Sequence, residues 1–188
     1  MPIPERSVEL RAARRDDLSA VQRLAHVIWH AHYPGIITAA QIDYMLARGY
    51  APEALAAFLD RPDRGLELAA VDGEPVGFAA WYVADEPGEV KLDKLYVLQS
   101  HQRHGLGRRL IERVADLARA AGAATLILNV NKRNAQAIRA YERHGFAIRA
   151  AVVNDIGNGF VMDDYLMAKS LRAGLGLPPS PPDANIVR

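Results

Sequence analysis

The segment from Lys91 to Ile111, KLDKLYVLQSHQRHGLGRRLI, constrains the fold of this chain most. An apolar, strand-like run enters a basic turn that contains Gly105 and Gly107, and the turn opens a helix with strong apolar periodicity. The helix is predicted to run from Gly105 to Ala121, with Gly122 just beyond its end. This order favours an α/β fold and leaves the first helical N–H groups free to meet an anion.

The remaining elements are predicted from periodicity and from turn residues. An edge strand at 7–13 precedes a helix that Asp16 or Asp17 caps, and residues 36–59 form a flap of two short helices. A hairpin over 66–83 turns at Asp72-Gly73, and a third strand covers 89–98. A buried strand at 124–130, a helix at 131–145 and strands at 146–153 and 160–170 complete a mixed sheet.

The third strand of the meander changes its alternation phase. Val90 and Leu92 share one phase, whereas Leu95 and Val97 share the other, so the pattern slips at Asp93-Lys94. Such a slip predicts a β-bulge, which leaves backbone groups unpaired and able to hold an extended ligand.

Composition narrows the possible partners. The 188 residues carry a formal net charge of +1, so we expect neither a nucleic acid nor a membrane as partner. The chain has no cysteine, which excludes disulfides, thiolate metal sites and a cysteine nucleophile. The N-terminus lacks the pattern of a signal peptide, and we expect a cytoplasmic protein with one domain at 1–171 and a proline-rich tail at 172–188.

The glycine turn matches neither the phosphate loop GxxxxGK[ST] nor the dinucleotide motif GxGxxG. With the bulged strand before it and NVNKRNAQAIRAYERHGF after it, the turn resembles the GCN5-related N-acetyltransferase (GNAT) superfamily. Gln102, Gly105 and Gly107 match the first family signature. The second signature falls on Asn134, Ala137, Tyr141, Gly145 and Phe146. The resemblance covers residues 7–171 and implies a mostly antiparallel sheet that splays between its fourth and fifth strands, flanked by helices.

The resemblance also implies the site for acetyl-coenzyme A. The turn amides would cradle the pyrophosphate, and the pantetheine arm would pair with the bulged strand as an added strand. Asn134 is expected on the pantetheine or diphosphate side, although an asparagine there is also an ordinary helix cap. The expected binding residues are Leu95, Tyr96, Val97, Gln102, Arg103, His104, Gly105, Leu106, Gly107, Arg108 and Asn134.

Catalysis requires a neutral amine, and deprotonating an alkyl ammonium at neutral pH costs about 4.6 kcal/mol. Asp93 at the bulge is the first candidate for a base or an amine-orienting group, with an ion pair to Lys94 or Lys91 as the alternative. Glu89 is the second candidate, but we favour the interpretation that its side chain is an exposed charge that faces solvent. The tyrosine of the family signature, Tyr141, is expected to donate a proton to the coenzyme sulfur, or else only to pack the helix on the sheet.

Further carboxylates, Asp155, Asp163 and Asp164, could hold a second positive charge of the substrate. An aromatic cluster at the end of the first helix, which includes Trp29, His32 and Tyr33, either lines the acceptor pocket or packs in the core. His101 and His104 have metal-like spacing, but no other ligand completes a set, so no metal is expected.

The sequence therefore predicts an acyltransferase that moves an acetyl group from acetyl-coenzyme A directly to a primary amine. Among relatives it looks most like the polyamine-acetylating type, which favours a small polyamine-like or amino-acid-like acceptor. One alternative is a catalytically silent acyl-coenzyme A sensing module, and another is an enzyme that acetylates a protein N-terminus or lysine. Exposed edge strands make a homodimer possible.

Overall fold

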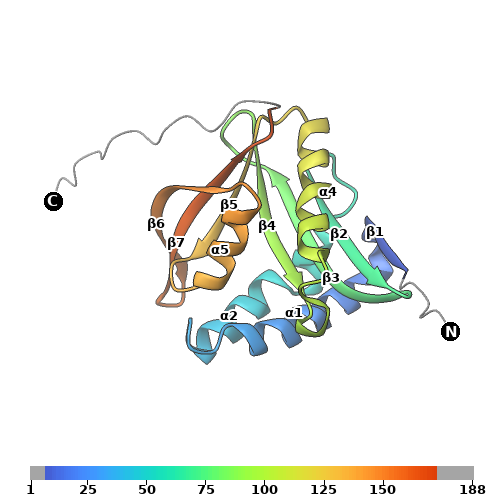
Figure 1. The fold of residues 1–188 in the computed structure, drawn as a ribbon. Helices are drawn as coiled ribbons and strands as arrows, with labels where there is room; N and C mark the ends of the chain where they lie inside the picture. The colour runs from blue at the N-terminus through green and yellow to red at the C-terminus, as the bar shows by residue number, and fades with distance from the viewer. Residues whose placement is uncertain (1–6, 173–188) are drawn as a thin grey trace.

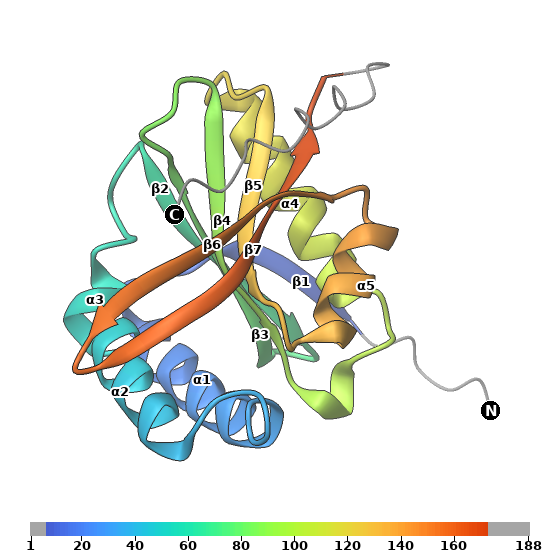
Figure 2. The same ribbon diagram turned by 90° about the vertical axis from the view of Figure 1, so that its left-hand side faces the viewer.

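The computed structural model describes residues 7–172 and consists of one seven-stranded sheet with helices on both faces (Figures 1 and 2). The strand order is β1-β2-β3-β4-β5-β7-β6. Every neighbouring pair is antiparallel except β4 and β5. The strands are β1 (Val8–Ala12), β2 (Arg64–Val71), β3 (Glu74–Val83), β4 (Glu89–Val97), β5 (Thr125–Asn131), β6 (Ala147–Gly157) and β7 (Phe160–Ser170). The predicted mixed, mostly antiparallel sheet is confirmed, and the tail from residue 173 lies outside the described residues.

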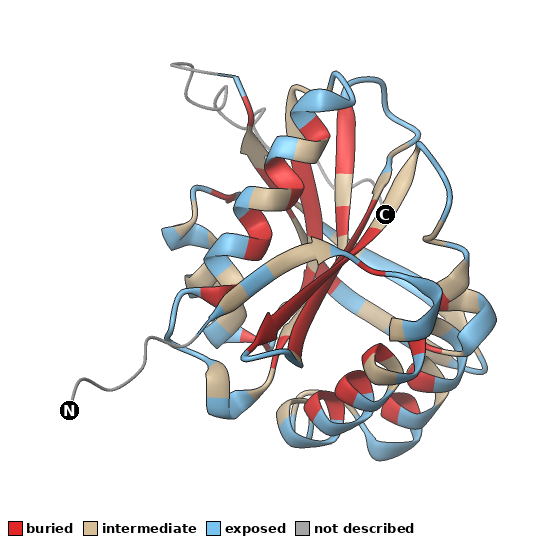
Figure 3. Ribbon diagram, turned by 90° about the vertical axis from the view of Figure 1, so that its right-hand side faces the viewer, coloured by how far each residue is buried: buried red, intermediate tan, exposed pale blue. Residues whose placement is uncertain are grey.

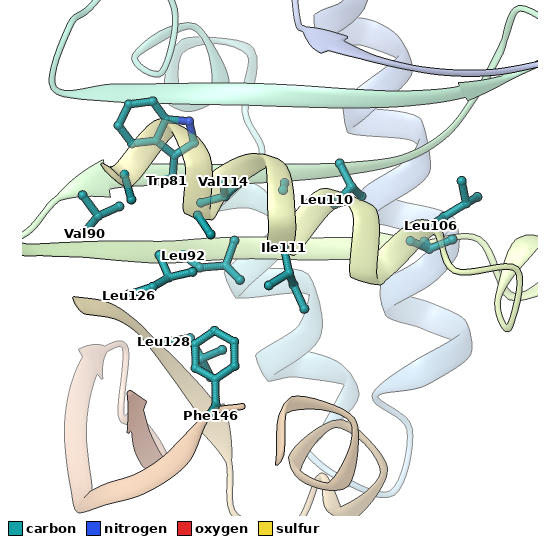
Figure 4. Packing of buried hydrophobic residues seen from close by; sticks show 14 of the residues in the cluster. Trp81, Val90, Leu92, Leu106, Leu110, Ile111, Val114, Leu126, Leu128 and Phe146 are labelled. Carbon is teal, nitrogen blue, oxygen red and sulfur yellow. The ribbon is translucent and has the colours of Figure 1, made fainter. Parts of the chain in front are cut away.

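Two helices, α4 (Leu106–Ala120) and α5 (Ala135–Arg143), cover one face of the sheet. The buried stripe of α4, with Leu106, Leu110 and Val114, packs on Trp81 and Leu92 of the strands (Figure 4). Aliphatic side chains four residues apart lie on one side of a helix, which is why this segment folds as an amphipathic helix over the sheet. Of the consecutive aromatic residues of β3, Trp81 is the one in this core.

The opposite face of the sheet is covered by α1 (Leu18–His32), α2 (Ala39–Gly49) and α3 (Pro52–Ala56). The apolar stripe of α1, which includes Val21, Leu24 and Ile28, is buried here, as the red bands of Figure 3 show. Thr38 caps α2 by accepting from the backbone N–H of Gln41. Within residues 7–172, no helix is both long and apolar enough to cross a lipid bilayer.

The predicted bulge is present in β4. Ala80 of β3 pairs with Lys94, whereas the next residue, Trp81, pairs with Leu92, so Asp93 is the extra residue. Because one residue is inserted, Asp93 and Lys94 both project toward the α1 face instead of alternating.

The predicted splay is also present. β4 and β5 pair only from Glu89 to Lys91, opposite Thr125 to Ile127. Beyond this point the two strands diverge, and the rest of β4 pairs with β3 alone among the described strands. The sheet thus opens toward the carboxyl ends of β4 and β5, beside the first turn of α4 (Figure 1).

Two local predictions need correction. Asp17 occupies the position before α1 but does not cap it, because its carboxylate accepts from the guanidinium of Arg11 and from the N–H of Arg14. Glu89 does not face solvent. It is 9% exposed and forms a two-pronged ion pair with Arg149 of β6. An arginine sixty residues away neutralises this charge, and the local pattern carries no sign of it.

Candidate active site

The loop between β4 and α4 presents a row of backbone amides. Gln102 ties the loop to β4, since its side-chain amide donates to the carbonyl oxygen of Val97 at 3.1 Å. Arg103 has φ of 66° and Gly105 has φ of 77°, and these left-handed residues turn the chain into the helix. Within residues 7–172, the N–H groups of residues 103–108 donate to no protein acceptor. The predicted anion cradle is therefore available for a ligand.

The two glycines of this loop leave room for close approach. A Cβ atom added at Gly105 or at Gly107 would have no protein atom within 4 Å. Arg103, His104 and Arg108 are exposed around the turn, and Arg108 also pairs with Glu112 one helical turn later. An anion such as a diphosphate could reach the amides without meeting side-chain bulk. The residues present thus fit the pyrophosphate of a coenzyme A molecule.

Beside this loop lies the opened edge of β4. Leu95, Tyr96 and Val97 pair with β3 on one side, while β5 has already diverged on the other. An extended chain with amide groups could add to this free edge by the ordinary hydrogen bonds of a sheet. The predicted coenzyme residues from Leu95 to Arg108 are therefore contiguous in space as well as in sequence.

Tyr141 lies on α5, on the same face of the sheet as α4. Its ring packs edge-on against Phe146 at 5.7 Å and contacts the core under α4. Burial raises the pKa of the Tyr141 hydroxyl, and the nearby Tyr33 adds to the effect. The phenol therefore stays neutral and able to donate a proton at all ordinary pH values. Both predicted roles, packing and proton donation, are compatible with this position.

Asp93 forms an ion pair with its neighbour Lys94 at 2.5 Å, with side chains only 26% and 11% exposed respectively. The Lys94 ammonium also sits over the rings of Tyr50 and Phe58, at 5.1 and 5.0 Å from their centroids. The bulge creates this arrangement by turning both side chains to one face. The ion pair that was the alternative for Asp93 is thus formed, and its role as base stays a prediction.

Aromatic residues from the end of α1, from the flap and from β4 form a cluster next to the opening. The rings of Trp29 in α1 and Tyr33 just after it lie 4.4 Å apart and tilted, and Trp29 donates to the hydroxyl of Tyr50 at 3.2 Å. The hydroxyls of Tyr33 and Tyr96 lie 3.2 Å apart. Burial raises the pKa values of Tyr33, Tyr50 and Tyr96, so the cluster offers neutral hydroxyl groups.

The start of α5 is linked to the end of α1 and the loop that follows it. Asn134 caps α5 by accepting from the N–H of Ala137, and its side-chain nitrogen lies 3.0 Å from Nε2 of His32. Arg133 donates to the carbonyl oxygens of Gly35 and Ile36. The cap role of Asn134 is therefore present in the structure, while its contact with a coenzyme stays a prediction.

A pocket of about 410 Å³ opens next to these links. Its walls come from the flap and from the ends of β5 and β7, and they include Ile36, Ile37, Gln41, Asn131, Arg133 and Asp163. It lies between the α1–α2 segment and the start of α5, at the ends of β5 and β7.

The fold agrees with comparisons to known proteins. The family model for the acetyltransferase (GNAT) family matches residues 26–146. The chain belongs to the GNAT family. A probable N-acetyltransferase from Mycobacterium tuberculosis is 26% identical over 144 residues, which are 76% of this chain and 81% of that protein. The streptothricin acetyltransferase of Streptomyces lavendulae is 38% identical over 88 residues, 47% of each chain.

Solved GNAT structures show the same fold. The PaiA N-acetyltransferase from Thermoplasma acidophilum, determined in complex with coenzyme A, aligns with a TM-score of 0.75 at 21% identity, over 87% of this chain and 99% of that one. The ribosomal-protein-S18-alanine N-acetyltransferase from Escherichia coli aligns with a TM-score of 0.67 at 25% identity, over 92% and 99%. This GNAT protein is accordingly an N-acetyltransferase.

Proposed function

We propose that the GNAT protein acetylates a small primary amine, polyamine-like or amino-acid-like, by direct attack of the amine on the thioester. Acetyl-coenzyme A supplies the activated acetyl group. The loop amides from Arg103 to Arg108 would hold its diphosphate, and the free edge of β4 at Leu95–Val97 would hold its pantetheine arm and the thioester carbonyl. Direct transfer is supported by the absence of cysteine from the chain, since an acyl-cysteine cannot form.

Tyr141 is proposed as the proton donor to the departing thiolate. Its buried, neutral hydroxyl on α5 supports this role, because a phenolate could not donate. Asp93 is kept as a candidate for orienting the amine, although its charge is already balanced by Lys94. Neither role requires a metal ion, and the absence of metal, the cytoplasmic location and the homodimer stay predictions.

The choice of a small acceptor rests on one observation, the hydrogen bonds that join the start of α5 to the end of α1 and the loop after it. Arg133 bonds to the carbonyls of Gly35 and Ile36, and Asn134 contacts His32, so the acceptor side is a bounded pocket. A polypeptide acceptor would need these links to open. One relative is, by its name, a streptothricin acetyltransferase, which also supports a small acceptor.

A competition experiment tests this choice. The enzyme is given acetyl-coenzyme A and an equimolar mixture of diamines, polyamines, amino acids and short peptides with free N-termini or lysines. Mass spectrometry then identifies the acetylated products. We expect one class of small amine to be acetylated first. Faster acetylation of the peptides would overturn the proposal and favour a protein acceptor.

A further inference from the structure

One buried carboxylate of β7 forms no ion pair with any residue in the described range 7–172. Asp164 of β7 is 4% exposed and lies between Asn131 of β5 and Val152 of β6. Its Oδ1 atom is buried without a hydrogen-bond partner among the described residues. The other two buried acidic side chains of residues 7–172 are both paired, Glu67 with Arg113 and Glu89 with Arg149.

Asp164 shares a face of the sheet with a residue of the pocket. Its cross-strand partner Asn131 lines the pocket, and residues opposite each other in a pair share a face. Tyr33, the residue after α1, lies close enough for the charge of Asp164 to raise the pKa of Tyr33, after the larger effect of burial. Since Tyr33 also meets Tyr96 of β4, Asp164 and Tyr96 flank the opening between β4 and β5.

The charged groups around Asp164 do not compensate its burial. Burial raises the pKa of Asp164, while Asn129 of β5 and the ammonium groups of Lys91 and Lys132 lower it only in part. Asp163 on the same strand raises it slightly further. Lys132 is itself engaged, since it pairs with Asp163 and lies over the ring of Tyr165. A buried carboxylate without its own cation lowers the stability of the fold. Proteins retain such a group at sites that bind a charged ligand.

We propose that Asp164 binds the ammonium group of the acceptor and takes the proton that the amine must lose before it attacks. This inference rests on the proposed function and adds a catalytic residue to it. Asp93 is less suited to the task, because Lys94 already occupies its carboxylate, whereas one oxygen of Asp164 is free.

The proton balance of the step is complete. The ammonium gives one proton to the Asp164 carboxylate, and the nitrogen lone pair forms a C–N bond with the thioester carbon. The C–S bond breaks, and the thiolate takes the proton of Tyr141. The nitrogen then loses its second ammonium proton, which restores the Tyr141 hydroxyl. Asp164 finally releases its proton to water, so that one proton appears in solution for each amide formed.

The test is Asp164→Asn, which keeps the shape and removes the charge. The control is Asp85→Asn, an exposed carboxylate in the turn between β3 and β4, and Asp93→Asn is the competing variant. The readouts are kcat/KM for the best amine across pH, the Kd for coenzyme A by calorimetry, and Tm. We expect Asp164→Asn to lose about 100-fold or more in kcat/KM and to keep the coenzyme Kd.

Two further readouts separate this role from a structural one. Because the pKa of Asp164 is raised, the wild type should lose stability as pH rises from about 3.8 through the folded value, and Asp164→Asn should not. The variant should thus match or exceed the wild-type Tm at pH 8. The wild-type kcat/KM should rise with pH through the same pKa. The kcat/KM of the variant should not show this rise.

The inference is overturned if Asp164→Asn keeps kcat/KM within about two-fold, or if it lowers Tm and coenzyme affinity together. An equal loss in Asp85→Asn also overturns it, because a general effect of removing negative charge would then explain the result. A wild type that transfers acetyl to no amine overturns the proposed function and this inference with it. An active wild type with an active Asp164→Asn variant overturns the inference alone.

Discussion

The side-chain amide of Gln102 donates to the carbonyl oxygen of Val97 at 3.1 Å, and this bond fixes the anion-binding loop to the free edge of β4. The two parts of the proposed coenzyme site are thus coupled by one hydrogen bond. In that proposal the loop would supply backbone amides for the diphosphate, and the strand edge would supply backbone groups for the pantetheine arm. Their relative position decides whether one extended molecule can reach both.

Removing this bond should weaken coenzyme binding. In Gln102→Ala the loop loses the hydrogen bond that holds it to β4. A hydrogen bond of this kind contributes about 1 kcal/mol, which corresponds to about a five-fold change in Kd. Calorimetric titration with coenzyme A measures the change. Gln99→Ala removes an exposed glutamine of the same loop and should leave Kd unchanged. Equal Kd values for the wild type and Gln102→Ala would contradict the coupling.

Gly105→Ala should impair both folding and binding, whereas Gly122→Ala should impair folding alone. The glycines have φ of 77° and 82°, and an added Cβ at either meets no protein atom within 4 Å. Each alanine is therefore strained by about 1 to 2 kcal/mol. Only the Cβ at Gly105, at the start of α4, would occupy the space proposed for the diphosphate.

Urea unfolding and coenzyme calorimetry together measure these two effects. The account expects similar losses in the free energy of unfolding for the two variants and a weaker Kd for Gly105→Ala only. If Gly122→Ala weakens binding as much, the loop before α4 is not the anion site.

Tyr141→Phe should lower kcat by about 100-fold or more while the coenzyme Kd and Tm stay near wild type. Phenylalanine preserves the packing on Phe146, so only the hydroxyl proton is lost. Tyr82→Phe, at the end of β3 where β4 and β5 are still paired, is the control and should keep full turnover. Unchanged kcat in Tyr141→Phe would leave only the packing role for this residue.

The ion pair at the start of α1 should make stability depend on pH. The hydrogen bond from Arg11 lowers the pKa of Asp17, so the pair stabilises the fold fully above about pH 3.8 and loses this effect as pH falls through the lower folded value. Asp17→Asn should cost about 1 to 2 kcal/mol at pH 7 and nothing at strongly acidic pH. Urea unfolding at several pH values measures this, with exposed Asp16→Asn as the control.

Local sequence signals predicted much of the fold. The phase slip at Asp93-Lys94 predicted the bulge, because alternation records which face each side chain occupies. The hairpin turn at Asp72-Gly73 was predicted as well, because these residue types tolerate positive φ. Both residues adopt positive φ in the structure. The splay between β4 and β5 followed from the resemblance to a family instead, because no local pattern encodes where two distant strands separate.

Pairings between distant residues were not predictable. Glu89 is neutralised by Arg149, and the unpaired state of Asp164 depends on what β4, β5 and α1 place around it. The contact of Asn134 with His32 joins residues about a hundred positions apart. Each depends on the packed sheet, whereas periodicity reports only on neighbours along the chain. The repeated acidic residues Asp163-Asp164 were the one signal, and they did not show which of the two is buried.

The central claim is that this GNAT protein transfers acetyl from acetyl-coenzyme A directly to an amine, and thiol release measures this most directly. A thiol-reactive dye reports free coenzyme A, and the cysteine-free protein adds no background. The account predicts release that accelerates with the concentration of one class of small amine, with intersecting initial-velocity lines for the two substrates. Release that never exceeds the acceptor-free rate across the panel, while calorimetry shows coenzyme binding, would contradict it and favour a sensing module.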